Sequence, residues 1–217
     1  MKKEKKSIAV LGLGKYGQSL AETLYDMGED VLVADINEKL IRDISGKVTS
    51  AVCADLSVED EIEALGLQNM DVVYVCMGGN NAASILSVSI AKEKGVKTVI
   101  AKASSPRMEK ILGRIGADKI INPEKEVGIR NARILASEHI RDFFEIDGKL
   151  CFVEYQPEKS WLDHDLVELN LRKMHNVNVV AIKKAHGKWD HIDPARKLKE
   201  EDLLMLVVKK EDMDKWR

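Results

Sequence analysis

Cysteine is scarce in this sequence, with only three among 217 residues. Cys53, Cys76 and Cys151 lie far apart, and none belongs to a C-x-x-C pair. Each lies in a short apolar stretch, so we expect small buried side chains in a reducing compartment, not a disulfide framework. The five histidines show no H-E-x-x-H spacing. Because a zinc site needs three or four converging ligands, the sequence argues against a structural metal.

Long apolar runs and an excess of charge of one sign are also missing. The first apolar stretch, residues 7–13, is too short for a signal-peptide core and for a membrane span. We therefore expect a cytoplasmic protein, which could still dock onto a membrane protein. Lys and Arg number 34 against 36 Asp and Glu, for a net charge of -2. Proteins that bind nucleic acid usually carry a basic excess, so no nucleic-acid partner is expected.

What the first 124 residues do contain is a regular alternation of two patterns. Short runs rich in Val and Ile are typical of strands buried on both faces, and the amphipathic segments between them are typical of helices. This series of about six βα units predicts an α/β fold with a doubly wound parallel sheet. We expect strands at 8–11, 31–34, 48–53, 72–77, 98–101 and 120–121, and helices at 17–27, 38–44, 58–65, 82–94 and 106–115.

A different pattern begins at Glu124. The stretch from there to about Glu145 has apolar residues on more than one face, which predicts a long helix. This helix either lies across its own domain or also packs on a second subunit. Beyond it, residues 150–217 predict a small α+β module with strands at 150–155, 177–184, 188–192 and 203–208, a helix at 166–175 and a short acidic helix at the end. The expected division is an N-terminal domain at 1–124, a crossover helix at 125–147 and a C-terminal domain at 148–217.

Three glycines carry the strongest chemical signal. Gly12, Gly14 and Gly17 form G-x-G-x-x-G between an expected strand and an expected helix. Gly12 permits the tight turn, Gly14 lets a phosphate approach the backbone, and Gly17 lets the helix pack close to the strand. Asp35 ends the second strand, where its carboxylate can accept hydrogen bonds from both ribose hydroxyls and would repel a 2′-phosphate. The pattern favours NAD, ATP or ADP over NADP.

Polar or small residues also follow the third, fourth and fifth strands. Asp55 comes after the third strand, where it could face the amino group of an adenine. Met77-Gly78-Gly79 follows the fourth strand, and Lys102-Ala103-Ser104 the fifth, where Lys102 could reach a phosphate. Each alone is as well explained by a solvated strand end. Their shared position at the carboxyl edge of the sheet, where open α/β sheets bind ligands, favours a site.

A catalytic group is harder to find. Tyr155 and Lys159 match the Y-x-x-x-K spacing of short-chain dehydrogenases, which needs both residues on one helix. Pro157 between them would break that helix, so we reject the match. The chain thus binds a nucleotide without visible means of using it, which favours sensing over enzymatic activity. The alternatives are an NAD-dependent oxidoreductase with an unrecognised substrate and a transcriptional sensor of NADH, although no helix-turn-helix is found.

Several stretches resemble one known family, the KtrA/TrkA-type cytoplasmic gating subunits of bacterial potassium uptake systems. The resemblance covers nearly the whole chain and is closest to the KtrA type. The stretches that carry it are AVLGLGKYGQSLAETLYDMGEDVLVADIN, AVCAD, KILGRIGADKIINPEKEVG, LVELNLRKMHNVNVVAIKK and EEDLLMLV.

The resemblance implies a Rossmann-like RCK N-terminal domain, a crossover helix and a small α+β RCK C-terminal domain. It also implies homodimers that assemble into a homo-octameric ring on the cytosolic face of a potassium-conducting membrane subunit of the KtrB/TrkH type. ATP would favour the active state and ADP the inactive one, and NAD(H) could occupy the same cleft.

Carried over by position, the resemblance places a nucleotide in a cleft and a cation near it. Glu124 would hold a divalent cation between the two nucleotides of a dimer. Lys15 stands where many KtrA proteins have Arg, so it keeps the charge near a γ-phosphate but loses the bidentate fork. The resemblance also implies that cyclic di-AMP can bind at the dimer interface of the C-terminal domain, where Arg172, His175 and Asn176 are candidate contacts or, alternatively, ordinary helix-end residues. The expected nucleotide contacts are Gly12, Gly14, Lys15, Tyr16, Gly17, Asp35, Ile36, Asn37, Asp55, Leu56, Met77, Gly78, Gly79, Lys102, Ala103 and Ser104.

Overall fold

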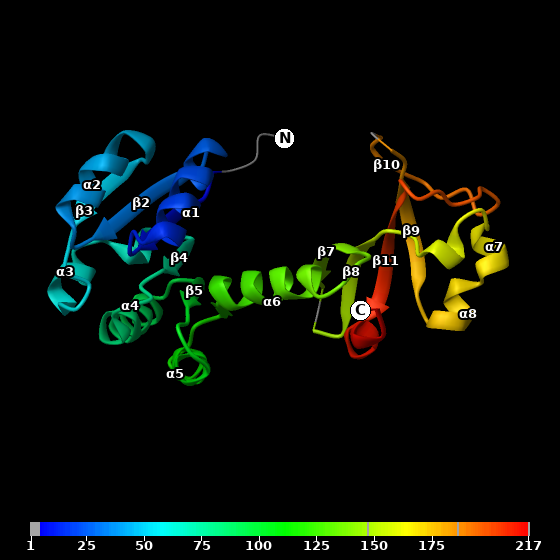
Figure 1. The fold of residues 1–217 in the computed structure, drawn as a ribbon. Coiled ribbons are helices and arrows are strands. Elements are labelled where there is room, and N and C mark those ends of the chain that lie inside the picture. Colours follow the sequence, from blue (N-terminus) through cyan, green and yellow to red (C-terminus); the bar gives the residue numbers. More distant parts are fainter. Residues whose placement is uncertain (1–4, 147, 186, 217) are drawn as a thin grey trace. The chain divides into compact units, whose positions relative to one another are not determined.

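The computed structural model describes residues 5–146, 148–185 and 187–216 (Figure 1). The chain divides into two compact units, which we call unit 1 (Met1–Pro123) and unit 2 (Glu124–Arg217). Each unit has its own sheet and its own buried core. We therefore describe the two units separately.

Unit 1 is built on a six-stranded sheet in which every neighbouring pair is parallel. Its order, β3-β2-β1-β4-β5-β6, is that of dinucleotide-binding folds, so the expected doubly wound sheet is confirmed. The strands are β1 (Ser7–Leu11), β2 (Asp30–Asp35), β3 (Ser50–Cys53), β4 (Val72–Val75), β5 (Thr98–Lys102) and β6 (Lys119–Ile121). The helices are α1 (Lys15–Asp26), α2 (Glu38–Ile44), α3 (Glu59–Glu63), α4 (Asn81–Glu93) and α5 (Pro106–Arg114).

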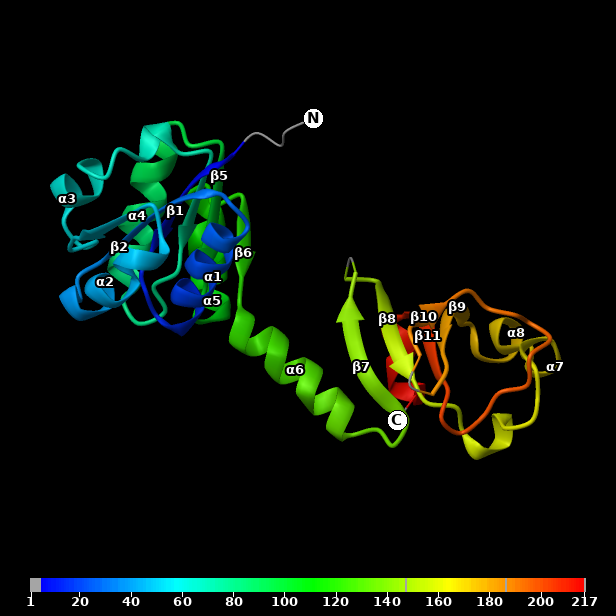
Figure 2. The ribbon, with the colours of Figure 1, turned by 90° about the horizontal axis from the view of Figure 1, so that it is seen from above.

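The central strand β1 shows why both faces of this sheet are covered. Its side chains alternate between two separate cores: Ile8 and Val10 join the cluster that includes α1 and α2, and Ala9 and Leu11 join the cluster that includes α3, α4 and α5. All four are almost completely buried. Figure 2 shows helices on both sides of the sheet. A strand that is apolar on both faces can be satisfied only in such a three-layer arrangement.

Unit 2 begins with α6 (Pro123–Leu135) and continues into an antiparallel sheet of order β10-β9-β11-β8-β7. Two short helices pack on this sheet and bury Leu171 against its core. The remaining elements are β7 (Ile140–Glu145), β8 (Leu150–Tyr155), α7 (Leu166–Leu169), α8 (Leu171–His175), β9 (Asn178–Lys183), β10 (Trp189–Asp190) and β11 (Leu203–Lys209). Short 3-10 turns lie at Lys159–Trp161 and Lys210–Trp216.

The expected long helix up to residue 147 is wrong over its second half. The helix ends at Leu135, and residues 140–145 form β7, while residue 147 lies outside the described residues. The pairing of β7 with β8 shifts register between Ile140 and Asp142. This irregularity puts Ile140 and Phe143, three residues apart, on the buried face, and a spacing of three is typical of a helix. Phe144 is exposed, beside Phe152 on β8.

Two arginines fasten α6 to this strand. Arg130 donates from Nε to Asp142 Oδ1 at 2.7 Å and from Nη2 to Oδ2 at 2.5 Å. Its guanidinium also lies 4.4 Å from the centre of the Phe144 ring, and that of Arg133 lies 4.6 Å from the Phe143 ring. The hydrogen bonds from Arg130 are the main reason why the pKa of Asp142 is lowered. Paired charges and cation–π contacts thus hold helix and strand together.

Two smaller expectations also need correction. The single helix expected at 166–175 is broken at Asn170, whose φ of 43° is left-handed and separates α7 from α8. Asn tolerates this conformation better than other residues with side chains, so the break is encoded locally. Cys53 is exposed, whereas Cys76 and Cys151 are buried as expected. Cys53 lies on β3, an edge strand of its sheet.

The glycine loop yields a stability prediction. A Cβ at position 17 would lie 2.1 Å from the carbonyl oxygen of Gly12, whereas a Cβ at position 14 would have no atom within 4 Å. Gly17→Ala should therefore lower the free energy of unfolding by about 3 kcal/mol, because α1 must move off the loop. Gly14→Ala should stay within about 0.5 kcal/mol of wild type. Urea unfolding of both variants measures this, and equal stabilities would contradict the close packing of α1.

Candidate functional site

The loop between β1 and α1 is positioned by backbone contacts at its start. Gly12 has a φ of 96°, and its N–H donates to Ala34 O at 2.8 Å. A Cβ there would lie 2.6 Å from Met77 Cγ, so only glycine fits between β1 and the end of β4. Gly14 then begins α1 with no side-chain cap and open space around it. The first turn of α1 has no acidic residue, so its N–H groups suit an anion.

Asp35 ties this loop to the end of β2. Its Oδ2 accepts from Leu13 N–H at 2.6 Å and its Oδ1 accepts from Asn37 N–H at 2.9 Å. Asn37 in turn caps α2, accepting from the N–H groups of Lys39 and Leu40. Each carboxylate oxygen has a second lone pair, so Asp35 can also accept from a ligand's hydroxyl groups.

A cavity of about 220 Å³ lies beside Asp35. It brings together five residues that the sequence predicts as site residues, namely Asp35, Ile36, Asp55, Leu56 and Met77. Ile36 is 64 % exposed, which is unusual for an isoleucine and is explained if a flat apolar group covers it. The cavity is also lined by Ser57, Asn80 and Ala83, which the sequence analysis did not predict.

Asn80 joins two sides of this cavity. Its Oδ1 accepts from Ala83 N–H at 3.0 Å and caps α4, and its Nδ2 donates to Ser57 Oγ at 2.9 Å. The signal that could have found it is an Asn at the start of an expected helix, a few residues after a strand end. Asn80 thus holds the loop after β3 against the beginning of α4.

Asp55, another residue of the cavity lining, is held in place by two hydrogen bonds. Its Oδ1 accepts from Ser57 N–H at 2.9 Å, and its own N–H donates to Glu61 Oε2 at 2.6 Å. Glu61, on α3, is a second supporting residue that the sequence analysis missed. The arrangement leaves Asp55 in the wall as a carboxylate acceptor, the chemistry that suits an exocyclic amino group.

The residues after β4 and β5 are placed differently from one another. A Cβ on Gly78 would lie 3.5 Å from Lys102 Nζ, so Lys102 reaches across to the end of β4. Ala103 is fully buried, and Ser104 Oγ lies 3.4 Å from Asn81 Oδ1. Burial raises the pKa of the Cys76 thiol to about 12, although the Lys102 charge opposes this shift. Cys76 is therefore neutral and no nucleophile at neutral pH.

The remaining nucleotide candidates lie on helix ends. Lys15 is the first residue of α1 and is exposed, and Tyr16 packs on the core under α1 and α2. Gly79 has open space around it. Glu124 is exposed in the first turn of α6 and belongs to unit 2. Within the described parts of a single chain, no group of three or more His, Cys, Asp or Glu side chains is arranged to hold a metal ion.

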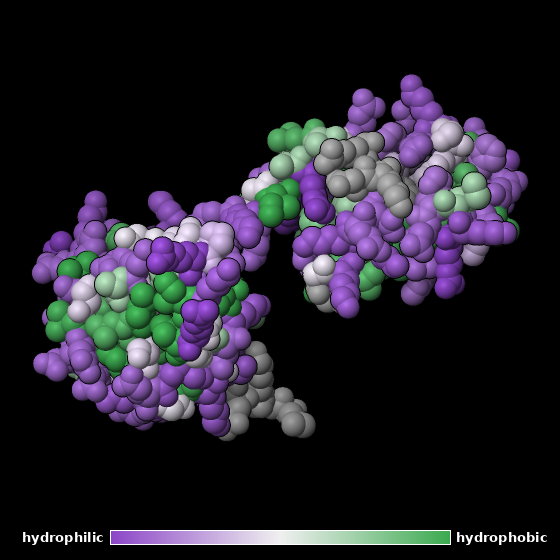
Figure 3. All heavy atoms as spheres, turned by 90° about the horizontal axis from the view of Figure 1, so that it is seen from below, coloured by the Kyte–Doolittle hydropathy of each residue, from purple (hydrophilic) through white to green (hydrophobic). Residues whose placement is uncertain are grey.

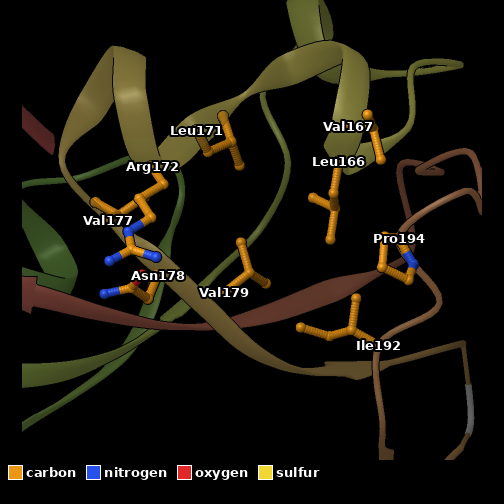
Figure 4. Close-up of a pocket in the computed structure, with 9 residues that line it drawn as sticks. All are labelled: Leu166, Val167, Leu171, Arg172, Val177, Asn178, Val179, Ile192 and Pro194. Carbon is orange, nitrogen blue, oxygen red and sulfur yellow. The ribbon is translucent and has the colours of Figure 1, made fainter.

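Unit 2 has a cavity of its own, of about 320 Å³, between α7, α8, β9 and the chain after β10 (Figure 4). Arg172 and Asn178 lie together at one side of it, and apolar side chains form the other walls. Of the three residues expected for cyclic di-AMP, only Arg172 lines it. His175 contacts the Trp161 ring, and Asn176 donates to Asp212 at 3.2 Å. The lining is Leu166, Val167, Leu171, Arg172, Val177, Asn178, Val179, Ile192 and Pro194.

The dehydrogenase-like spacing at Tyr155 forms no catalytic pair. Tyr155 ends β8, and its buried hydroxyl donates to Glu158 Oε1 at 2.8 Å. Burial is the main reason why the pKa of this phenol is raised, with the bond to Glu158 second. A proton donor of this reaction type needs a lowered pKa instead.

Among the residues that the structure describes, no helix is long and apolar enough to cross a membrane.

Comparison with known sequences identifies the family of this chain. Residues 8–123 match the TrkA-N domain family. Over 214 residues the chain is 34 % identical to the Ktr system potassium uptake protein C of Bacillus subtilis (strain 168), covering 98 % of this chain and 96 % of that protein. Protein A of the same system and organism is 32 % identical over 213 residues, covering 97 % and 95 %. The chain belongs to the TrkA-N family, with the Ktr type of potassium uptake protein among its relatives. The resemblance found in the sequence is confirmed.

A solved structure supports the same fold. The GsuK channel bound to NAD superposes with a TM-score of 0.66 at 14 % identity. The match covers 98 % of this chain but only 39 % of that longer one. At this identity the likeness shows the fold alone, including both the parallel and the antiparallel sheet.

The open space at Gly14 gives the site its most direct test. Gly14→Ala adds a methyl group where no protein atom lies within 4 Å, so the fold should tolerate it. If phosphates lie against the N–H groups of α1, the methyl group should weaken ADP binding about tenfold or more, through the loss of a charged hydrogen bond. Calorimetric titration measures this, with Gly46→Ala as a control, since position 46 also has open space and lies in the short 3-10 turn before β3, outside the proposed site. Wild-type affinity in Gly14→Ala would place the phosphates elsewhere.

Proposed function

We propose that this chain is a cytoplasmic, nucleotide-sensing regulatory subunit of a bacterial potassium uptake system. The observation that carries the proposal is the Asp35 network, in which one carboxylate fixes the glycine loop and also lines the adjoining cavity. The names of the Ktr relatives, which align over nearly their whole length, support the link to potassium uptake.

The ligand is an adenine nucleotide. The α1 N-terminus takes its phosphates, Asp35 its ribose and Asp55 its adenine amino group. NAD in the GsuK neighbour supports such a ligand but does not choose between NAD(H) and ATP or ADP. ATP and ADP share their adenosine half, so only the γ-phosphate can give different binding energies. The positive charge of Lys15, the first residue of α1, supports a contact with this phosphate.

The subunit acts as an oligomer. Figure 3 shows apolar side chains gathered on one face of unit 1. Partly buried side chains that can form such a face come from α4 and α5, namely Ile85, Leu86, Ile111 and Ile115. In unit 2, Leu135 is 86 % exposed, and Phe144 and Phe152 are adjacent and exposed. Apolar surface of this kind marks protein interfaces, here with further copies in a dimer and a ring.

A cation and a membrane partner complete the proposal. Triphosphates that face each other across a dimer repel, so a divalent cation held by Glu124 would lower the cost of the ATP state. The ring acts on a potassium-conducting membrane subunit of the KtrB/TrkH type. ATP shifts the complex towards one gating state because its γ-phosphate makes contacts that ADP cannot make.

A second ligand, cyclic di-AMP, is proposed for the cavity in unit 2. Its apolar walls suit nucleobases, and Arg172 beside Asn178 suits a phosphate and a base edge. The alternative function, an NAD-dependent oxidoreductase, has less support. Its only sequence candidate for a proton donor, Tyr155, is buried with a raised pKa.

The adenine assignment is tested by Asp55→Asn. Asn can still accept from Ser57 N–H, but its amide nitrogen cannot accept from an adenine amino group. We expect ATP to bind about tenfold more weakly. ITP, which carries a carbonyl oxygen in place of that amino group, should bind at least as well as to wild type, because the amide N–H of Asn can donate to this oxygen. Calorimetry with both nucleotides measures the ATP preference over ITP. A preference that survives the substitution would remove Asp55 from adenine recognition.

The sensing mechanism is tested by Lys15→Ala and Glu124→Gln. Both contacts need the third phosphate, so each change should compress the ATP–ADP difference in ion flux and leave ADP affinity unchanged. Flux through the complex reconstituted with its membrane subunit is the measurement. Lys97→Ala is the matched control, because Lys97 is exposed and precedes β5 at the opposite edge of the sheet. Full ATP preference in both variants would contradict the mechanism.

A further inference from the structure

One wall of the cavity in unit 2 is a long loop without regular structure. Residues 191–202 connect β10 to β11 and contain no helix or strand. They supply Ile192 and Pro194 to the cavity lining, across from Arg172 and Asn178 in the close-up (Figure 4). Ordering a loop of this length costs conformational entropy, so something specific must hold it in shape.

Backbone hydrogen bonds attach the middle of this loop to the chain around α7. Leu166 N–H donates to Pro194 O at 3.1 Å, and Leu198 N–H donates to His164 O at 2.9 Å. In the reverse direction, Asp163 N–H donates to Leu198 O at 3.0 Å. Leu198 is buried in the core of unit 2. The loop and the start of α7 are therefore joined directly, and both contribute to the cavity lining.

A buried ion pair closes the end of the same loop. Arg196 donates from Nη1 to Asp202 Oδ2 at 2.7 Å and from Nη2 to Oδ1 at 2.9 Å. Lys199 N–H also donates to Asp202 Oδ2, at 2.8 Å. Asp202 is 0 % exposed, so its carboxylate cannot exchange these donors for water. A buried carboxylate strongly disfavours any loop shape that separates it from its partners.

We propose that Arg196 and Asp202 are positioning residues for ligand binding in this cavity, because their ion pair holds the loop that carries Ile192 and Pro194. Neither residue is part of the cavity lining, so the effect passes through the loop. The inference rests on the proposed cyclic dinucleotide site. The inference adds one prediction to that site: the affinity for cyclic di-AMP depends on the Arg196–Asp202 ion pair, although neither residue lines the cavity.

The test compares Arg196→Lys with Arg130→Lys in the full-length protein. Lysine keeps the charge but loses the two-pronged geometry. Arg130 likewise makes two hydrogen bonds to one carboxylate, that of Asp142, in the same unit and outside the cavity lining. Two readouts are taken: cyclic di-AMP affinity by calorimetry, and amide hydrogen exchange without ligand. We expect Arg196→Lys to lower the affinity about tenfold. It should also speed exchange in 163–170 and 192–202 and leave β11 unchanged.

The outcomes are distinguishable. Arg130→Lys should leave the affinity and the exchange in 163–170 and 192–202 unchanged, and any faster exchange should be confined to α6 and β7, which Arg130 joins. If it lowers affinity equally, or if Arg196→Lys raises exchange throughout unit 2, general destabilisation replaces the positioning role. Wild-type affinity in Arg196→Lys would overturn the inference. If the wild type binds no cyclic di-AMP, the proposed ligand is wrong, and exchange in the two segments alone decides whether the ion pair holds the wall. Asp202→Asn, which keeps the side chain's shape, should have the same two effects and replaces Arg196→Lys if that variant does not fold.

Discussion

The carboxylate of Asp35 is the group on which the rest of unit 1's site depends. It accepts from Leu13 N–H in the glycine loop and from Asn37 N–H before α2, so one side chain fixes the loop, the end of β2 and the start of the next helix. Both N–H groups would otherwise need water or a ligand. Because the protein itself supplies these bonds, the loop is formed without a ligand, and the proposed nucleotide would spend little binding energy on ordering it.

Similar hydrogen bonds from short polar side chains to nearby backbone N–H groups occur after β3 and β4. Asp55 accepts from Ser57 N–H, and Asn80 accepts from Ala83 N–H and donates to Ser57 Oγ. Each short polar side chain satisfies the backbone just beyond its own strand. In a parallel sheet these ends meet at one edge, so residues far apart in sequence become neighbours there. The polar edge is thus a consequence of ending several buried strands together.

Much of unit 1 could be predicted from the sequence because its signals are local. Glycine spacing, apolar runs and Asp35 each report on their own segment, and the parallel sheet order follows from them. Glu61 could not be predicted, because its value lies in a contact to Asp55 that depends on the loop path. In unit 2 the irregular pairing of β7 produced the three-residue spacing of a helix. Asn178 lines the cavity there, whereas the side chain of Asn176 donates to Asp212, a contact that local sequence does not predict.

The two cavities differ in how firmly their walls are held when no ligand is bound. In unit 1 the polar groups of the cavity wall bond to backbone N–H groups next to the strands, so the wall keeps its shape when empty. In unit 2 one wall is a loop held by hydrogen bonds to the chain around α7 and by one buried ion pair. A rigid site can distinguish ligands by their extra groups, as a γ-phosphate requires. A wall held by few bonds can become more ordered when a ligand fills the cavity. Ligand binding can then affect the rest of the protein by reducing the motion of this loop as well as by changing its shape.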